Sequence, residues 1–89
     1  MPRIVFTPQL RRFVDAPDFE TGALQLRAAL EDCFAAHTRL RGYVLDDQAH
    51  LRANVVIFID GRRQRDAVAL SDALQPHSVV HVLQALSGG

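Results

Sequence analysis

The 89-residue sequence has one cysteine and no lysine, and its charges cancel. The single Cys33 excludes an internal disulfide and a Cys-x-x-Cys metal site. Without lysine, the chain has no ε-amine for Schiff-base chemistry or for conjugation to its own side chains. Ten arginines balance ten acidic residues, so no global electrostatic field favours nucleic acid or an anionic membrane as a partner.

Long hydrophobic runs are also missing. No apolar stretch approaches the ~20 residues that a membrane-spanning helix needs, and the N-terminus lacks the pattern of a secretory signal. We therefore expect a cytoplasmic protein. With 48% hydrophobic and 22% charged residues, the composition is that of one ordinary globular domain with a modest core.

The first part of the chain predicts two strands. Residues 2–7 are rich in β-branched and aromatic side chains and are followed by Pro8, which predicts a strand that ends there. Residues 9–14 follow almost at once, and we expect them to return as the second strand of a hairpin, although their alternation is imperfect. Residues 15–18, Asp-Ala-Pro-Asp, then break regular structure.

One long helix is predicted over residues 22–37, with Thr21 as its N-cap. The apolar stripe that predicts it consists of Leu26, Leu30, Cys33, Phe34 and His37. On this stripe Cys33 reads as a small core residue rather than a reactive thiol. His37, at the end of the helix, is expected to interact with the helix dipole or to be partly buried.

The second half of the chain is richer in strands. Residues 38–51 show no sustained period and predict a connection pinned to the core by apolar side chains, namely Leu40, Tyr43, Val44 and Leu45. Residues 54–60 form the strongest strand pattern, and Asp60-Gly61 predicts a two-residue turn into a polar return strand at residues 62–65. A short helical turn is expected at residues 70–74, and a last strand at residues 78–84.

This order of elements favours the α+β class and specifically the β-grasp arrangement. In it, a mixed sheet of about four to five strands wraps around one long helix, with the first and last strands parallel at the centre. The predicted sheet contribution to the core is Ile4, Phe6, Val55, Ile57, Ile59, Val80 and Val82. We divide the chain into a β-grasp domain at residues 1–86 and a flexible Ser-Gly-Gly tail at residues 87–89.

The tail is the most informative stretch of the sequence. Gly88 and Gly89 lack a Cβ, so another protein can approach their backbone closely. Such a tail could thread a narrow channel and present the α-carboxylate of Gly89 to a reactive centre. The alternative is a frayed chain end without a function.

Alternation in the strands also predicts an apolar patch on the outer face of the sheet. If the core residues face the helix, then Val56, Phe58, His81 and Leu83 face outward, with Leu86 closer to the tail. Exposed apolar patches often bind partners. The alternatives are that residues 38–51 cover this face or that the two faces are reversed.

No catalytic or metal-binding set is predicted. His77 and His81 would lie about 13 Å apart on a strand, too far to share one metal ion. The sequence suggests no Ser/His/Asp set, and Gly42 and Gly61 are isolated turn glycines rather than a phosphate-binding loop. We therefore expect a protein that is not an enzyme and holds no cofactor or metal.

The chain resembles the MoaD/ThiS family of ubiquitin-like sulfur carriers in its order of elements and in three local features. These are the segment Ile57-Phe-Ile-Asp-Gly-Arg62, Leu74 before a turn, and the ending Leu83-Gln-Ala-Leu-Ser-Gly-Gly89. The resemblance implies that a partner similar to ubiquitin-activating enzymes uses ATP and Mg²⁺ to adenylate the Gly89 carboxylate, with Gly88 as its slender neighbour. Sulfur transfer then gives a thiocarboxylate.

The second partner implied by the resemblance is a sulfur-accepting synthase, of the molybdopterin synthase large-subunit, thiazole synthase or cysteine synthase type. The chain departs from the family pattern in two places: His77-Ser78 stands where Gly-Asp is common, and Gln84 where proline is frequent. The first departure weakens the sequence evidence for a turn before the last strand. Neither departure affects the chemistry proposed at the terminal carboxylate.

Two other functions remain open. A ubiquitin-like modifier joined to lysines of other proteins needs the same adenylation, so the sequence does not separate it from a carrier. A β-grasp interaction domain with an idle tail is the third possibility.

Overall fold

The computed structural model describes residues 1–84, which contain short helices and strands in mixed order. In chain order these are β1 (Arg3–Phe6), η1 (Leu10–Arg12), β2 (Phe19–Glu20), α1 (Leu26–Ala36), η2 (Thr38–Leu40), α2 (Arg41–Val44), β3 (Val55–Ile59), β4 (Arg62–Arg63) and β5 (Val79–Gln84). Here η denotes a 3₁₀ helix. Among these residues no helix is both long and apolar enough to cross a membrane.

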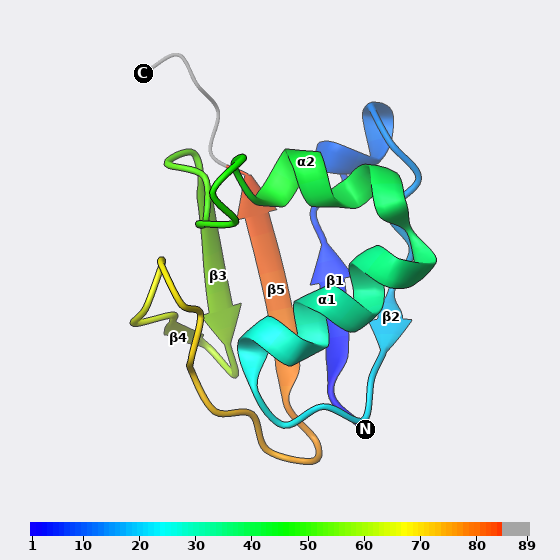
Figure 1. Cartoon of the computed structure of the whole chain (residues 1–89). Coiled ribbons are helices and arrows are strands. Elements are labelled where there is room, and N and C mark those ends of the chain that lie inside the picture. The colour runs from blue at the N-terminus through cyan, green and yellow to red at the C-terminus, as the bar shows by residue number, and fades with distance from the viewer. Residues whose placement is uncertain (85–89) are drawn as a thin grey trace.

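Within residues 1–84 the strands form one five-stranded sheet in the order β2-β1-β5-β3-β4. The central pair β1 and β5 is parallel, with Ile4 opposite Val80, and the other neighbours are antiparallel. The parallel pair of first and last strands that the sequence predicted is therefore present. Figure 1 shows β5 running through the middle of the sheet, away from the N-terminus.

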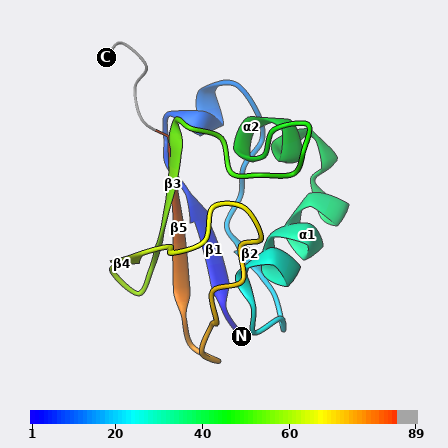
Figure 2. The same cartoon turned by 60° about the vertical axis from the view of Figure 1, so that its left-hand side comes forward.

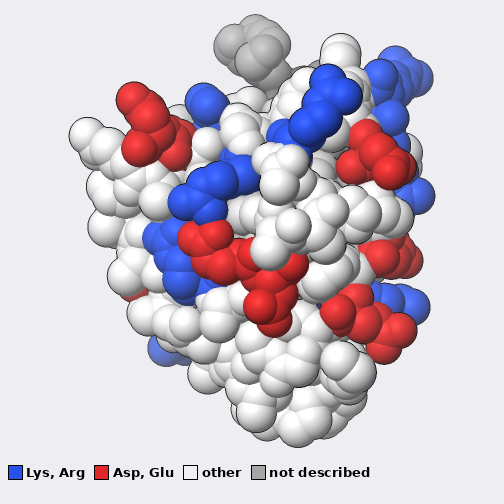
Figure 3. All heavy atoms as spheres, turned by 45° about the vertical axis from the view of Figure 1, so that its right-hand side comes forward, with Lys and Arg blue, Asp and Glu red and all other residues white. Residues whose placement is uncertain are grey.

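The helices of residues 1–84 cover one face of the sheet, and no helix of this part of the chain lies on the other face, which we call the open face. Figure 2 views the sheet nearly edge-on, with α1 and α2 on the same side of it. Charged residues of both signs are interspersed over the helix-covered side (Figure 3). Residues 38–51, which contain η2 and α2, thus pack on the helix side and do not cover the outer face.

The core lies between the helices and the inner face of the sheet. All seven strand residues predicted to be in the core are buried, and Leu26, Leu30, Cys33 and Phe34 of α1 pack against them. Of the side chains expected to pin residues 38–51, Leu40, Val44 and Leu45 are buried and Tyr43 packs against the core half-buried. The alternation of buried and exposed residues in β3 and β5 confirms which faces point inward.

The predicted hairpin at the start of the chain is wrong. Residues 9–14 do not form a strand; they contain the turn η1, which buries Leu10, and Val14 just after it is also buried. The Phe13 and Val14 amides both donate hydrogen bonds to the Leu10 carbonyl oxygen, so the backbone turns back on itself here and does not extend as a hairpin strand. The antiparallel partner of β1 is the two-residue strand β2.

The long helix is shorter than predicted, and Thr21 is not its N-cap. α1 begins at Leu26 after an extended Gln25. The Thr21 hydroxyl instead accepts a hydrogen bond from the Ala23 amide (3.0 Å) and donates one to Asp32 (2.7 Å). Thr21 therefore fixes the approach to the helix from outside it. His37, at the other end, is half-buried and stacks edge-to-face on Phe19 with ring centroids 6.1 Å apart.

The expected helical turn at residues 70–74 is also absent. Leu70 is buried with a positive φ of 54°, and Asp72 accepts hydrogen bonds from the Arg65 and Asp66 amides. These contacts hold the segment as an irregular loop. The return strand predicted for residues 62–65 is limited to β4, after which the Gln64 side chain accepts from the Ile57 amide.

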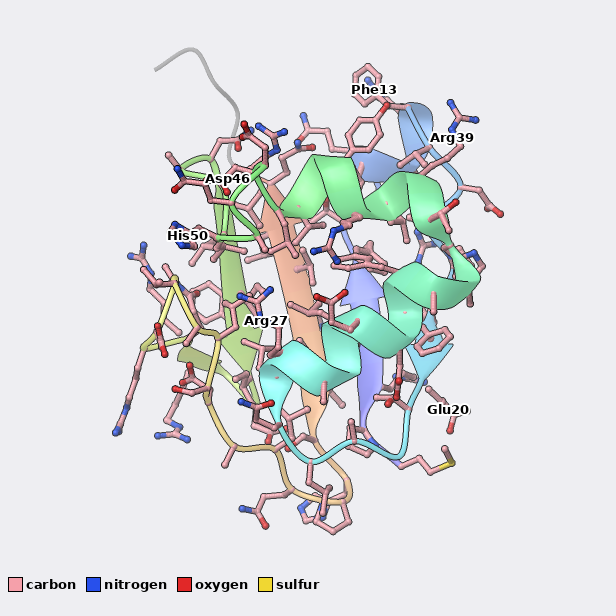
Figure 4. All side chains as sticks on the ribbon, viewed as in Figure 1. Phe13, Glu20, Arg27, Arg39, Asp46 and His50 are labelled. Carbon is pink, nitrogen blue, oxygen red and sulfur yellow. The ribbon has the colours of Figure 1, made fainter. Side chains whose placement is uncertain are left out.

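Arg27 ties this irregular loop to α1. Its guanidinium donates hydrogen bonds to the carbonyl oxygens of Ala49 (2.7 Å), Val68 (2.8 Å) and Ala69 (3.3 Å). It also lies 3.7 Å from Glu31, which pairs in turn with Arg41 of α2. In Figure 4, Arg27 lies between α1 and the loops. One arginine thus holds two loops against the helix.

Candidate functional site

The open face of the sheet carries a patch of side chains from two neighbouring strands. Val56 and Phe58 of β3 stand opposite Leu83 and His81 of β5. Val56, Phe58 and Leu83 are half-buried, and His81 is exposed. These four residues, which we call the outer patch, lie together on one surface as the sequence predicted. That they bind a partner remains a prediction.

Two valines extend the outer patch beyond the residues predicted from the sequence. Val5 of β1 pairs with His81, and Val79 precedes His81 by two positions on β5. Val5 and Val79 therefore face outward, as His81 does. Both are half-buried. The alternation of β1, with Ile4 and Phe6 inward, would have indicated Val5 had it been applied to that strand.

Charged side chains border the outer patch at two edges of the sheet. Arg63 of β4 pairs with Phe58 and so lies beside it on the open face. At the opposite edge Arg3 of β1 pairs with Glu20 of β2, so a negative charge lies across from the positive charge of Arg3. The central row from Arg63 through Phe58 and His81 to Val5 is therefore basic at the β4 end, and its apolar members are Phe58 and Val5.

The turn before β5 is fixed by Ser78 and Asp60. The Ser78 hydroxyl donates to the Asp60 carboxylate (2.7 Å) and accepts from the Gln75 amide (2.8 Å). Asp60 also accepts from the Val79 amide (2.9 Å). The hydrogen bond from Ser78 is the main cause that lowers the pKa of Asp60, followed by that from Val79. Ser78 thus supplies the turn contact at the position where this sequence departs from the Gly-Asp pattern.

The two-residue turn Asp60-Gly61 between β3 and β4 has the geometry expected from its sequence. Both residues have positive φ, 52° for Asp60 and 85° for Gly61. This is the conformation of a type I′ hairpin turn, which favours Asp-Gly. The turn brings Arg63 back beside Phe58.

The predicted reactive residues Gly88 and Gly89, and the predicted contact Leu86, lie outside the described residues. The structure does describe the strand that leads to them: β5 ends at Gln84, on the central axis of the sheet. The residue count from Gln84 to Gly89 allows the terminal carboxylate to lie at most about 17–18 Å from this strand end.

The other candidate reactive groups in residues 1–84 are side chains of metal-ligand type and the Cys33 thiol. No three His, Cys, Asp or Glu side chains of this part of the chain gather to hold a metal ion. The Cys33 thiol is fully buried, and burial raises its pKa to about 11. One surface hollow is lined by Val14, His37 and Arg39 beside the C-terminal end of α1.

Comparison with known proteins gives structural matches but no sequence match. No protein-family model matches the chain, and no curated protein matches it in sequence. Among solved structures it is similar to the BexX/CysO complex of Amycolatopsis orientalis, with a TM-score of 0.83 and 13% identity over 100% of both chains. The chain has the ubiquitin-like β-grasp fold.

Two further β-grasp structures are similar over nearly their whole length. The small archaeal modifier protein 1 (SAMP1) from Methanosarcina acetivorans has a TM-score of 0.77 and 18% identity, covering 99% of this chain and 95% of that chain. Urm1 from Sulfolobus solfataricus has a TM-score of 0.70 and 13% identity, covering 93% of this chain and 99% of that chain. At these identities the likeness establishes the shared fold.

Proposed function

We propose that the chain is a sulfur carrier whose Gly89 carboxylate is converted to a thiocarboxylate. The observation that carries the proposal is the β-grasp sheet with its last strand at the centre: β5 is held on both sides by β1 and β3, and the Ser87-Gly-Gly89 ending follows it in the sequence. A rigid body thereby supports a terminus without side chains, which an enzyme can enclose closely.

The proposed chemistry takes place on partner enzymes. In the active site of an adenylating enzyme that uses ATP and Mg²⁺, a Gly89 carboxylate oxygen attacks the α-phosphorus of ATP and pyrophosphate leaves. Sulfide released by a sulfur donor then attacks the carbonyl carbon and AMP leaves, giving the thiocarboxylate. This chain contributes the carboxylate, the narrow Gly88-Gly89 backbone and a docking surface. We propose that it holds no cofactor of its own and acts in the cytoplasm.

The outer patch is the proposed docking surface. Phe58 and Leu83 are apolar, only half-buried and on the one sheet face that no helix covers. Such a face suits both an adenylating enzyme and a sulfur-accepting synthase of the molybdopterin, thiazole or cysteine type. Docking there would hold the body while the terminus enters the active site.

A direct test is to incubate the chain with an adenylating enzyme from the same genome, ATP, Mg²⁺ and a sulfur donor, and to measure its intact mass. We expect a mass increase equal to one oxygen-to-sulfur exchange, located on the C-terminal peptide. A variant that lacks Gly89 should fold normally and show no increase. A truncated chain that still accepts sulfur would contradict the proposal.

A protein modifier is the second candidate, because one of the similar structures is named a small archaeal modifier protein. In this case the activated Gly89 carbonyl would be joined to lysine amines of other proteins. Lysine-linked adducts in cells that express the chain would favour the modifier, whereas a free thiocarboxylate would favour the carrier. An interaction domain with an idle tail predicts neither product.

A further inference from the structure

Three arginines lie at one edge of the sheet without a partner in the described structure. Arg62 and Arg63 form β4, Arg65 follows shortly after, and all three are exposed. Within residues 1–84 none of the three guanidinium groups forms an ion pair or donates a hydrogen bond. Four other guanidinium groups are held by carboxylates or carbonyl oxygens, namely those of Arg11, Arg27, Arg41 and Arg52. Arg3, Arg12 and Arg39 have no such partner within residues 1–84 either, but they do not lie together at one edge.

The acidic residues beside this edge are already bound elsewhere. The Asp60 carboxylate accepts hydrogen bonds from the Ser78 hydroxyl, in the turn before β5, and from the Val79 amide at the start of β5. The oxygens of Asp66 and Asp72 accept from nearby backbone amides and from the Ser71 hydroxyl. Arg62 contributes weakly to the lowered pKa of Asp60 but makes no ion pair with it. The edge therefore keeps its positive charge toward solvent.

The part of this charge that lies at Arg63 is continuous with the outer patch, whereas Arg62 pairs with the core residue Ile59. Arg63 pairs with Phe58, so both side chains lie on the open face, one strand apart. A partner that covers Phe58 also covers the space in front of Arg63. At the edge of such an interface, a positive charge is attracted by a negatively charged partner surface and repelled by a positive one. A partner that places a carboxylate opposite Arg63 is therefore favoured.

We propose that the β4 edge, formed by Arg62, Arg63 and Arg65, binds an acidic rim on the protein that docks over the outer patch. This inference rests on the proposed function and specifies the chemistry of the partner surface: an apolar area that covers Phe58, flanked by aspartate or glutamate side chains that face Arg63. Charge pairs at the rim of an interface act mainly on the association rate and on its dependence on salt.

A charged edge also protects a sheet from aggregation, and charge reversal separates the two roles. Charges of either sign prevent strands from pairing at an edge, so glutamate at position 63 keeps that protection. Recognition of an acidic surface requires the positive sign. Arg39 provides the matched control: it is exposed, lies in η2 on the helix side of the molecule, and has no ion pair within residues 1–84.

The first experiment measures the rate of thiocarboxylate formation by the adenylating enzyme as the concentration of the carrier chain is varied. For Arg63→Glu we expect KM to rise about tenfold at low ionic strength with kcat unchanged, and the rise to shrink at high salt. Arg39→Glu should behave like the wild-type chain. Equal KM values for Arg63→Glu and the wild type would overturn the inference, whereas the absence of exchange in the wild type would overturn the proposed function.

The second experiment does not depend on the proposed function. A decaglutamate peptide and a single-stranded RNA of ten nucleotides are titrated separately into the ¹⁵N-labelled chain, and amide shifts are followed by NMR. We expect the peptide to shift the amides of residues 58 and 62–65, and Arg63→Glu to weaken this binding at least several-fold. Shifts located elsewhere, or tighter binding of the RNA than of the peptide at the same sites, would overturn the inference.

Discussion

Phe58 of β3 and His81 of β5 stand directly opposite each other on the open face of the sheet. Their immediate neighbours Ile57 and Val82 are paired in the same way on the buried face. Adjacent residues of β3 thus lie on opposite faces of the sheet, Ile57 in the core and Phe58 on the open face. Substitutions at the two positions should therefore affect stability and partner binding separately.

Phe58→Arg should weaken partner binding at least tenfold and leave the fold intact. Because Phe58 is half-buried and faces away from the core, we expect the free energy of unfolding to fall by about 1 kcal/mol or less. Partner affinity is measured by titration with the adenylating enzyme, and stability by urea denaturation.

Ile57→Ala is the control for this experiment. Ile57 is fully buried, and its truncation should cost about 2–5 kcal/mol through lost burial and a cavity. If Phe58→Arg destabilised the chain as much as Ile57→Ala, then Phe58 would be a core residue and not a docking residue.

Arg27→Met should destabilise the chain more than its partial exposure suggests. Methionine keeps much of the aliphatic stem but removes the donors to the carbonyl oxygens of Ala49, Val68 and Ala69. We expect a loss of about 1–3 kcal/mol in urea denaturation, since these acceptors lose a charged donor. Amide hydrogen exchange should rise in residues 45–51 and 66–70. Arg39→Met should change stability by less than about 0.5 kcal/mol, and an equal effect of the two substitutions would show that the Arg27 contacts are unimportant.

Asp66 should make stability depend on pH below pH 4. Hydrogen bonds from the Ser71 hydroxyl and then the Ala69 amide lower the pKa of Asp66 from 3.8 to about 2. A carboxyl group with a lower pKa in the folded than in the unfolded state stabilises the fold above its unfolded pKa. That contribution is lost as the pH falls from about 3.8 to about 2.

Asp66→Asn should therefore lower the urea midpoint at neutral pH and flatten its decrease between pH 4 and pH 2. The matched control is Asp47→Asn, since Asp47 is exposed and its side chain accepts no hydrogen bond within residues 1–84. An unchanged pH profile in Asp66→Asn would rule out this residue as the source of the acid sensitivity.

Cys33 should resist thiol reagents as long as the chain is folded. Its side chain is fully buried, and burial raises its pKa to about 11, so little thiolate forms at neutral pH and the reagent has no access. Iodoacetamide at pH 8 should label Cys33 only at the rate at which the chain opens, and rapidly in urea. Rapid labelling without denaturant would show that α1 leaves the sheet readily.

The sequence predicts best those elements that local pattern determines. The alternation in β3 and β5 assigned their inner and outer faces correctly, because one buried face leaves only one register. The Asp60-Gly61 turn was also predictable, since both residues tolerate a positive φ. From these elements the β-grasp fold and the position of the outer patch follow.

The errors arose where long-range contacts decide the local structure. Thr21 has the residue type of an N-cap, but its hydroxyl binds Asp32, eleven residues away, and the helix starts later. β2 has only two residues and carries no periodic signal. The loop around Leu70 takes its shape from Arg27, more than forty residues earlier.

The central position of β5 determines how the molecule bears mechanical load. A pull on the chain beyond Gln84 is directed along β5, so it acts in shear on the hydrogen-bond ladders to β1 and β3 at the same time. A strand at the edge of the sheet would carry the same pull through one ladder only. We therefore expect the domain to resist a pull on the chain beyond Gln84 better than it would if β5 lay at an edge.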